Sequence, residues 1–327
     1  MGKRVRKKMT GLLIILGGLF IVVASTLAYY IIVNKAPIIQ GKVAYHINYT
    51  DNQKLDIYHP TRTVYDKSPV IIYIHGGAWV AGTKGAINFN RFNLAINDLR
   101  KSGYTIVCPN YTLARSGKSP FPDCISDAFK AVKWVEDNAD KYNLDLSNVG
   151  LLGESAGSHI AMMKTFAPAD TFETIGSEIK FRYLINIYGP NDLEALYRAP
   201  LLDSIYQVIE RLPAGIQNQL DLAKIIFGFD PNEDSVKTEE FIRKYSPVTY
   251  IDASMPPMLL IHGDRDRVVP VEQSIQLSTR LKDLGVRHQL HVLEGVDHAF
   301  RGATQEQRQN IQHWVIQFVK ENYSPLK

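Results

Sequence analysis

A serine between two glycines is the first feature of this sequence that could carry chemistry. Residues 153–157 read G-E-S-A-G, so Ser155 stands at the centre of a G-x-S-x-G pattern. An apolar run precedes the pattern and small residues follow it, which predicts a strand, a tight turn and a helix. The hydroxyl of Ser155 would then project from a sheet, and the Ala156 N–H at the helix start would point to where an oxyanion forms. The pattern predicts a nucleophile and one oxyanion donor.

The predicted nucleophile needs a base, because a serine hydroxyl attacks only when a neighbouring group takes its proton. His298 lies within residues 295–300, which read G-V-D-H-A-F, after the last apolar run and before the C-terminal helical pattern. A loop at that position lies at the same edge of the sheet as the carboxyl ends of the other strands. We therefore predict that His298 is the base rather than a surface histidine.

A third group must orient the histidine, and in the chain order that begins with the serine it lies between the serine and the histidine. The apolar run that begins at Met258 leads into two acidic residues, Asp264 and Asp266. Asp264 follows the run more closely, whereas Asp266 stands deeper in the loop and ahead of a helical segment. The residue pattern does not rank the two carboxylates.

A second oxyanion donor is expected in the H-G-G-A-W segment at residues 75–79, which also follows an apolar run. Glycines let the backbone approach a ligand closely and turn its N–H groups inward. We expect His75 to brace this loop by hydrogen bonding rather than to transfer a proton. A tight turn without a binding role is the alternative interpretation of the two glycines.

Strands must position these segments, because each follows a short apolar run. The runs lie at residues 69–74, 104–108, 149–152, 183–188, 258–262 and 289–293, with helical patterns of period 3.6 between several of them. Before them, alternation in residues 43–49 and 54–58 predicts an antiparallel hairpin. Continuous apolar strands alternating with helices predict an α/β fold whose mostly parallel sheet is covered on both faces. Such sheets carry their chemistry at the carboxyl ends of the strands.

One segment, between Tyr188 and Met258, breaks this alternation and contains several helical stretches. We interpret residues 191–250 as a helical insertion before the last two strands. Two roles are open for it: a cap over the strand ends, or a set of packing helices without a gating function.

The N-terminus has the pattern of a membrane anchor. Residues 1–10 hold five Lys and Arg and no acidic residue, and residues 11–33 are uncharged and mostly apolar. About 20 apolar residues cross a bilayer, so we predict a transmembrane helix at 11–33, a linker at 34–42 and a catalytic domain at 43–327. The positive-inside rule keeps the basic tail cytoplasmic and the domain extracytoplasmic, at the cell membrane in a bacterium. A cleaved signal peptide is the alternative.

Composition excludes several other classes of protein. A hydrophobic fraction of 45% and a charged fraction of 21% are those of a globular chain. The net charge of +4 lies in the N-terminal tail, and without a basic cluster elsewhere no nucleic-acid partner is expected. No His, Cys, Asp or Glu group has metal-ligand spacing, so we expect no metal and no cofactor. Cys108 and Cys124 either pair outside the membrane or stay buried thiols.

Together these motifs resemble the α/β-hydrolase superfamily, in particular its esterase and lipase group, which includes acetyl esterases, carboxylesterases and kynurenine formamidases. The resemblance covers residues 43–322 and includes N-Y-T-L-A at 110–114, which is similar to the group's N-Y-R-L-A-P with departures at Thr112 and Arg115. It implies that Asp266 is the acid. It also implies that the oxyanion donors are the N–H groups of Gly77, Ala78 and Ala156.

The resemblance implies a serine carboxylester hydrolase that forms an acyl-enzyme on a small-molecule ester. H-G-G-A-W in place of H-G-G-G favours the acetyl-esterase or formamidase branch, and Trp79 would add bulk at the pocket wall, so we expect short acyl groups. An amidase, a peptidase or a lipase would use the same triad, and the insertion would suit a lipase groove. A catalytically silent binding protein is the alternative from another class, which the intact Ser155, Asp266 and His298 disfavour. No feature of the sequence fixes an oligomeric state.

Overall fold

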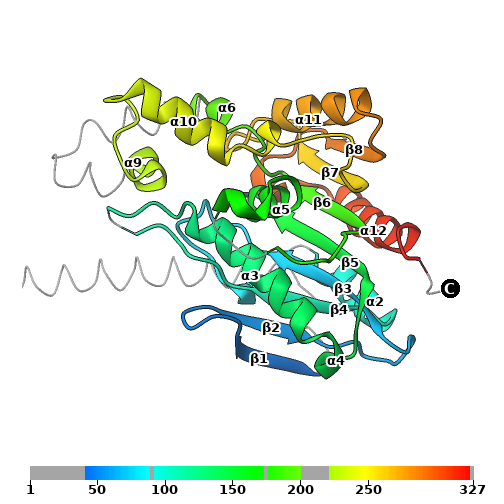
Figure 1. The fold of residues 1–327 in the computed structure, drawn as a ribbon. Coiled ribbons are helices and arrows are strands. Elements are labelled where there is room, and N and C mark those ends of the chain that lie inside the picture. The colour runs from blue at the N-terminus through cyan, green and yellow to red at the C-terminus, as the bar shows by residue number, and fades with distance from the viewer. Residues whose placement is uncertain (1–40, 89–91, 116, 173–175, 200–220, 325–327) are drawn as a thin grey trace, which may run out of the picture.

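An eight-stranded sheet, in the order β1-β2-β4-β3-β5-β6-β7-β8, forms the centre of the computed structural model (Figure 1). The structure describes residues 41–88, 92–115, 117–172, 176–199 and 221–324. The strands within them are β1 (Val43–Asn48), β2 (Lys54–Tyr58), β3 (Ser68–Ile74), β4 (Thr105–Pro109), β5 (Leu144–Glu154), β6 (Tyr183–Ile187), β7 (Met258–Gly263) and β8 (His288–Leu293).

The sheet is mostly parallel, as the apolar runs predicted. Strands β4, β3, β5, β6, β7 and β8 pair in parallel, and the predicted β1–β2 hairpin joins this array with β2 antiparallel to β4. Strand β5 begins at Leu144, earlier than the predicted run at 149–152. Its first part is irregular: Asp145 pairs with Pro69 and Val149 with Val70, so the residues between them bulge out. The polar side chains of that bulge hid the strand start from the apolar pattern.

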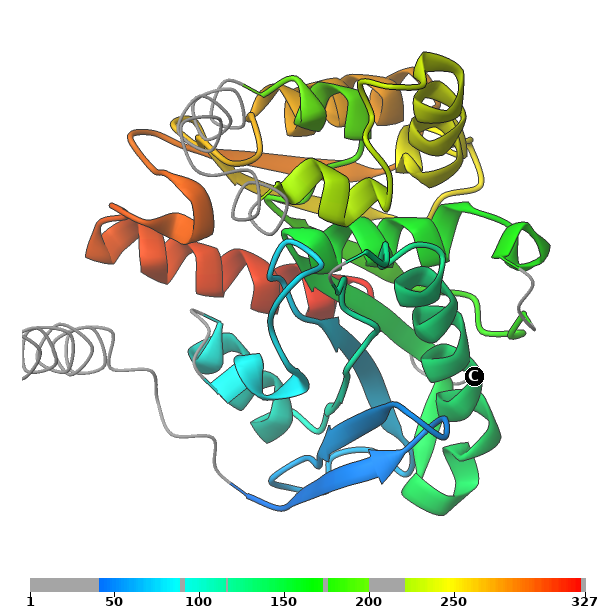
Figure 2. The same ribbon diagram turned by 90° about the vertical axis from the view of Figure 1, so that its left-hand side faces the viewer.

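Helices cover both faces of the sheet, which confirms the expected layering. One face packs against α3 (Asp123–Asp137), α5 (Ala156–Phe166) and α11 (Glu272–Asp283), and the other against α2 (Asn93–Lys101) and α12 (Gln305–Glu321). Within β3, Ile72 belongs to the first core and Ile71 to the second, as the alternation of side chains along a strand requires. Figure 2 shows the red helix α12 on one side of the strands and the green helix α3 on the other.

Five shorter elements complete the described part of the chain. They are η1 (Lys84–Asn88), α4 (Ala139–Tyr142), η2 (Ala169–Phe172), η3 (Pro247–Thr249) and η4 (His298–Phe300).

The segment between β6 and β7 is helical, as predicted. It contains α6 (Leu193–Tyr197), α9 (Leu222–Phe227) and α10 (Ser235–Tyr245), while residues 200–220 lie outside the described part. An aspartate caps each of the three helices by accepting backbone N–H groups of the first turn. Figure 1 shows α9 and α10 grouped beside α5 and the near end of α3.

The predicted cytoplasmic tail at 1–10 and membrane span at 11–33 fall outside the described residues, as does most of the linker. Within the described part, none of the helices has the length and apolar character needed to cross a bilayer. The fold described here begins with the hairpin at β1.

The two cysteines are free thiols, which decides between the two alternatives that the sequence left open in favour of buried thiols. Both are fully buried, with Cys108 in the core on one face of the sheet and Cys124 in the core on the other. The sheet itself separates them. Burial raises the pKa of each thiol well above its ordinary value, which keeps both protonated and unreactive.

We predict that Ellman's reagent modifies neither thiol of the native protein at an appreciable rate. In the absence of reductant, the chain unfolded in guanidinium chloride should show both thiols, reacting at least ~100-fold faster than in the native state, because modification requires opening of the core. Fewer than two reactive thiols in the unfolded chain would show a disulfide and contradict this burial.

Candidate active site

Ser155 occupies the turn between β5 and α5, in a backbone conformation that few residues adopt. Its φ is 50° and its ψ is −121°. The Ser155 N–H donates to the Ile187 carbonyl of the neighbouring strand (2.9 Å), and its own carbonyl accepts the His159 N–H (3.2 Å). A positive φ at a non-glycine residue persists only where the surroundings over-determine it, and such strain concentrates at functional sites.

The two glycines that flank Ser155 are required by close packing. A Cβ added to Gly153 would lie 2.5 Å from the Gly157 carbonyl oxygen, and one added to Gly157 would lie 2.2 Å from the carbonyl oxygen of Ile74 in β3. Both distances are far below van der Waals contact. The start of α5 can therefore approach β3 and β5 only because these positions carry no side chain.

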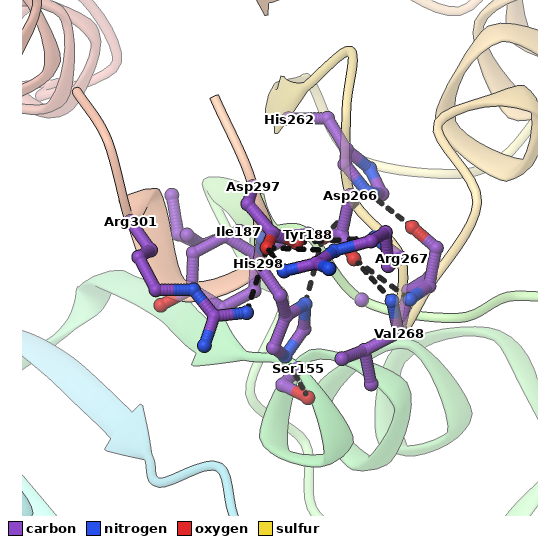
Figure 3. Close-up of polar contacts among 12 residues, drawn as sticks. Ser155, Ile187, Tyr188, His262, Asp266, Arg267, Val268, Asp297, His298 and Arg301 are labelled. Atoms are coloured by element: carbon purple, nitrogen blue, oxygen red, sulfur yellow. Dashed lines mark hydrogen bonds and ion pairs between the residues drawn. The ribbon is translucent and has the colours of Figure 1, made fainter. Parts of the chain in front are cut away.

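The structure brings His298 and Asp266 together with Ser155 at the carboxyl edge of the sheet (Figure 3). His298 lies in η4 after β8, with Nε2 3.1 Å from Ser155 Oγ and Nδ1 2.7 Å from Asp266 Oδ2. With Nδ1–H donating to the carboxylate, Nε2 can accept the serine proton. The side chain of His298 is 15% exposed, so part of the imidazole is accessible to solvent.

Asp266 is held rigidly in the loop after β7. Its Oδ1 accepts the N–H groups of Val268 (2.9 Å) and Val269 (2.8 Å), and its Oδ2 lies 3.2 Å from His262 Nε2. Burial raises the pKa of Asp266, but hydrogen bonds from His262 and His298 outweigh this and lower the pKa to about 2. The carboxylate is therefore ionised at neutral pH, and its stabilising contribution is lost only as the pH falls below about 4 toward 2.

Asp264, the second acidic candidate, has a different role in the loop. It is exposed, and its Oδ1 accepts the N–H of Gly295 (2.7 Å), which ties the loop after β7 to the loop after β8. The residue pattern left the two acids unranked. The geometry places Asp266 against His298, in agreement with the resemblance.

The predicted oxyanion loop passes directly beside the nucleophile. A Cβ added to Gly76 would lie 3.3 Å from Ser155 Cβ, and one added to Gly77 would lie 2.1 Å from the Ala81 carbonyl oxygen. Gly77 and Ala78 have φ of 126° and 52°, so the backbone turns sharply at the two predicted donors. Ala156 follows Ser155 as the first residue of α5. All three predicted donor positions thus lie on segments adjoining Ser155.

His75 braces this loop, as expected. Its Nδ1 lies 2.8 Å from the Gly76 carbonyl oxygen, and its ring stacks on Tyr111, whose hydroxyl donates to the His75 carbonyl. Burial lowers the pKa of His75 to about 4, against the opposing hydrogen bond to Gly76, so the ring is neutral near pH 7.

Sequence reasoning missed Tyr188, which directly follows β6. Its ring packs against His298 with 4.8 Å between centroids, and its hydroxyl donates to Glu154 Oε2 (3.0 Å). Tyr73 donates to the other oxygen of the same carboxylate (2.7 Å). The partners of Tyr188 lie far away in the sequence, so no local pattern reveals them. The one available signal was the position of Tyr188 at the carboxyl end of a strand, on the edge of the sheet that carries the site.

Asp297 is a second residue that the sequence reasoning missed. Its carboxylate accepts from Arg267 (2.6 Å), from Arg301 (2.7 Å) and from the N–H of His298 (2.7 Å). Burial raises the pKa of Asp297, but these hydrogen bonds, with Arg267 foremost, hold it well below its ordinary value. The ionised side chain clamps the loop that carries Asp266 to the loop that carries His298.

No group of three His, Cys, Asp or Glu side chains is placed to hold a metal ion within the described part of the chain. The arrangement at the sheet edge has the parts for acyl transfer: a positioned hydroxyl, an imidazole within reach of its proton, a buried carboxylate behind the imidazole and backbone donors beside the hydroxyl.

A comparison with models of protein families identifies the family of this chain. The BD-FAE family model matches residues 55–281, well over half of the sequence. The chain belongs to the BD-FAE family. The matched region includes the oxyanion loop, Ser155 and Asp266, and it ends before His298. Together with the fold, this membership confirms the α/β-hydrolase resemblance and its esterase and lipase group.

The BD-FAE chain is similar to esterases in sequence and in fold. It is 27% identical to the esterase LipC of Mycobacterium tuberculosis over 76% of this chain and 57% of the relative. It is 26% identical to the isoprenylcysteine alpha-carbonyl methylesterase ICME of Arabidopsis thaliana over 75% of this chain and 53% of that protein. The chain thus spans a little over half the length of these relatives. A truncated carbohydrate esterase from gut microbiota shares the fold, with a TM-score of 0.64, 22% identity and coverage of 87% and 99%.

We predict that Asp266→Asn lowers ester turnover by at least ~10³-fold, because the amide would donate to His298 and impose the wrong tautomer. Asp264→Asn is the matched control, since the asparagine oxygen can still accept from Gly295, and its turnover should stay within about threefold of wild type. Steady-state kinetics of the two purified variants test this. A larger loss in the Asp264 variant would transfer the role to that residue.

Proposed function

We propose that this BD-FAE protein is a serine carboxylester hydrolase. The observation that carries the proposal is the continuous relay from Ser155 Oγ through His298 to Asp266, with the glycine loop beside it. The relatives named as esterases support the same reaction class. Amide hydrolysis uses the same relay, and no feature of the site favours it over ester hydrolysis.

The proposed reaction follows from the geometry. Ser155 Oγ attacks the ester carbonyl while His298 Nε2 takes its proton, and Asp266 stabilises the imidazolium. The N–H groups of Gly77, Ala78 and Ala156 stabilise the oxyanion of the tetrahedral intermediate. His298 then protonates the leaving alcohol, which leaves an acyl-enzyme. Water, deprotonated by the same imidazole, hydrolyses that ester and restores Ser155.

We predict that Ser155→Ala lowers kcat by at least ~10³-fold and leaves the fold intact, because only the nucleophile is removed. A fluorophosphonate probe should label the wild type and not this variant. The exposed Ser254 supplies a control, and Ser254→Ala should keep both labelling and turnover. Turnover retained by Ser155→Ala would overturn the nucleophile assignment. A wild type without ester turnover or labelling would favour the silent binding protein.

We propose short acyl groups as the preferred substrates, and ring packing beside the oxyanion loop supports this. Trp79, at the end of that loop, is 2% exposed, and its ring contacts Phe121 (5.7 Å) and His159 (5.1 Å). Phe121 in turn packs on Tyr245 of the insertion (4.9 Å). These rings occupy the space between the loop and the insertion, where a long acyl chain would need room.

We predict that acetyl to butyryl p-nitrophenyl esters have kcat/KM values more than about tenfold above that of the decanoyl ester. The reason is that a filled pocket sterically excludes additional methylene groups, whereas in an open pocket each methylene would contribute ~1 to 3 kcal/mol of binding free energy. A chain-length series at concentrations below micelle formation measures this. A maximum at long chains with activation at a lipid surface would instead make the protein a lipase and the insertion its lid.

We also propose that residues 11–33 anchor the protein in a membrane with its catalytic domain on the extracytoplasmic side. The sequence supports this through the uncharged apolar segment and the basic residues before it. Protease added outside intact cells or spheroplasts should then digest the domain while a cytoplasmic marker survives. A chain that is protected there and extracts without detergent would contradict both the anchor and its orientation.

A further inference from the structure

A groove at the end of the sheet remote from Ser155 gathers basic and aromatic side chains. It has a volume of about 640 Å³ and lies between the segment before β3, the end of α2 and the end of α12. Figure 1 shows the red end of α12 on the side of the molecule away from α9. The side chains on which its chemistry depends are Arg62, Lys101, Lys320, Tyr65, Tyr104 and Tyr323.

The cations of this groove are available to an anion. Lys101 lies 3.6 Å from Asp98, an exposed and weak pair, and the structure gives Arg62 and Lys320 no ion pair within the residues it describes. Arg62 Nε donates to the backbone carbonyl of Lys101 (3.3 Å), which places the Arg62 guanidinium at the C-terminal end of α2. A guanidinium and two ammonium groups that line one groove suit a phosphate.

The aromatic side of the groove suits the polar interface of a bilayer. Tyr65 packs against Tyr323 (4.8 Å) and Tyr104 (6.2 Å), and the neighbouring Val64 is 51% exposed. Burial raises the pKa of Tyr104, so its hydroxyl is neutral. Tyrosine rings and basic residues around an exposed apolar side chain are the mixture found at membrane–water interfaces.

The chain enters the domain beside this groove. A Cβ added to Gly41 would lie 2.8 Å from Thr61 Cγ2, and Thr61 precedes Arg62. The predicted membrane span ends at residue 33, and the chain from there to Gly41 reaches at most about 29 Å when fully extended. The length of this linker therefore limits how far the groove can lie from the bilayer that holds the span.

Strand directions place the catalytic edge on the opposite side. β1 is antiparallel to β2, and β2 is antiparallel to β4, so β1 starts at the sheet end where β3 and its parallel neighbours also start. Ser155, Asp266 and His298 all follow carboxyl ends of strands. A strand the length of β3 separates the two ends by about 20 Å.

We propose that the groove binds the phosphate of an anionic phospholipid in the anchoring membrane and so holds the catalytic edge toward water. This inference rests on the proposed anchor. It also deepens the proposed function, because the substrate becomes an ester delivered from the aqueous phase rather than one drawn from the bilayer.

The test uses the full chain in nanodiscs of phosphatidylcholine alone or with phosphatidylglycerol, and reads amide hydrogen exchange. With phosphatidylglycerol, residues 61–66, 101–105 and 320–324 should exchange at least ~3-fold more slowly. The triple variant Arg62→Gln, Lys101→Gln, Lys320→Gln should lose this protection. A charge-matched variant with Lys118, Lys237 and Lys244, all exposed and near the insertion, changed to Gln should keep it.

Equal exchange in the two kinds of disc, or equal loss in the matched variant, would overturn the proposal. Inorganic phosphate that gives the same protection on phosphatidylcholine discs would make the groove a free-anion site and overturn the lipid assignment. A chain that inserts in neither disc would remove the anchor and the inference with it. Hydrolysis of p-nitrophenyl acetate in the same discs reports the proposed reaction separately, and the triple variant should retain it.

Discussion

The backbone of Ser155 is the constraint on which the rest of the site depends. A residue with a positive φ costs about 1–3 kcal/mol, so neighbouring contacts must hold it. The Ser155 N–H reaches the Ile187 carbonyl of β6, and the Ser158 hydroxyl one turn later accepts the Ile187 N–H and donates to the Gly153 carbonyl. The turn is thus fastened to two adjacent parallel strands. The glycines at 153 and 157 allow this, since a side chain at either position would push α5 away from the sheet.

His298 is held by a second set of contacts, which depends on the parallel pairing of β7 and β8. Three carboxylates join the loops that follow these strands: Asp264 accepts from Gly295, Asp266 accepts from His298, and Asp297 accepts from Arg267. Only the middle one faces the imidazole. The outer two contribute rigidity, and the arginines neutralise the charge of Asp297, which would otherwise compete with Asp266 for the imidazolium. Preorganisation of this kind costs no rearrangement when the reaction occurs.

The sequence predicted the parts of this arrangement that depend on local pattern. Strands buried on both faces must be continuously apolar, so their positions were readable, whereas the start of β5 was not, because Asp145 and Asn148 satisfy each other in a polar bulge. The choice between Asp264 and Asp266 needed either a family resemblance or a structure. It depends on Val268 and Val269 turning their N–H groups toward one carboxylate, which spacing does not reveal. Tyr188 and Asp297 escaped notice because their partners meet only in the tertiary fold.

The insertion is physically continuous with the catalytic machinery through His159. This residue of α5 is fully buried, its ring meets the edge of Trp79 on the oxyanion loop, and its Nε2 lies 2.7 Å from the Tyr245 carbonyl of α10. Burial lowers the pKa of His159 to about 4, so the ring is neutral and Nε2–H donates near pH 7. The unfolded chain takes up this proton near pH 6.5, so stability falls as the pH drops from there toward 4. The neutral His159 therefore links the nucleophile helix, the oxyanion loop and α10. A movement of α10 must displace the His159 ring, which packs against Trp79 on the loop that carries the oxyanion donors.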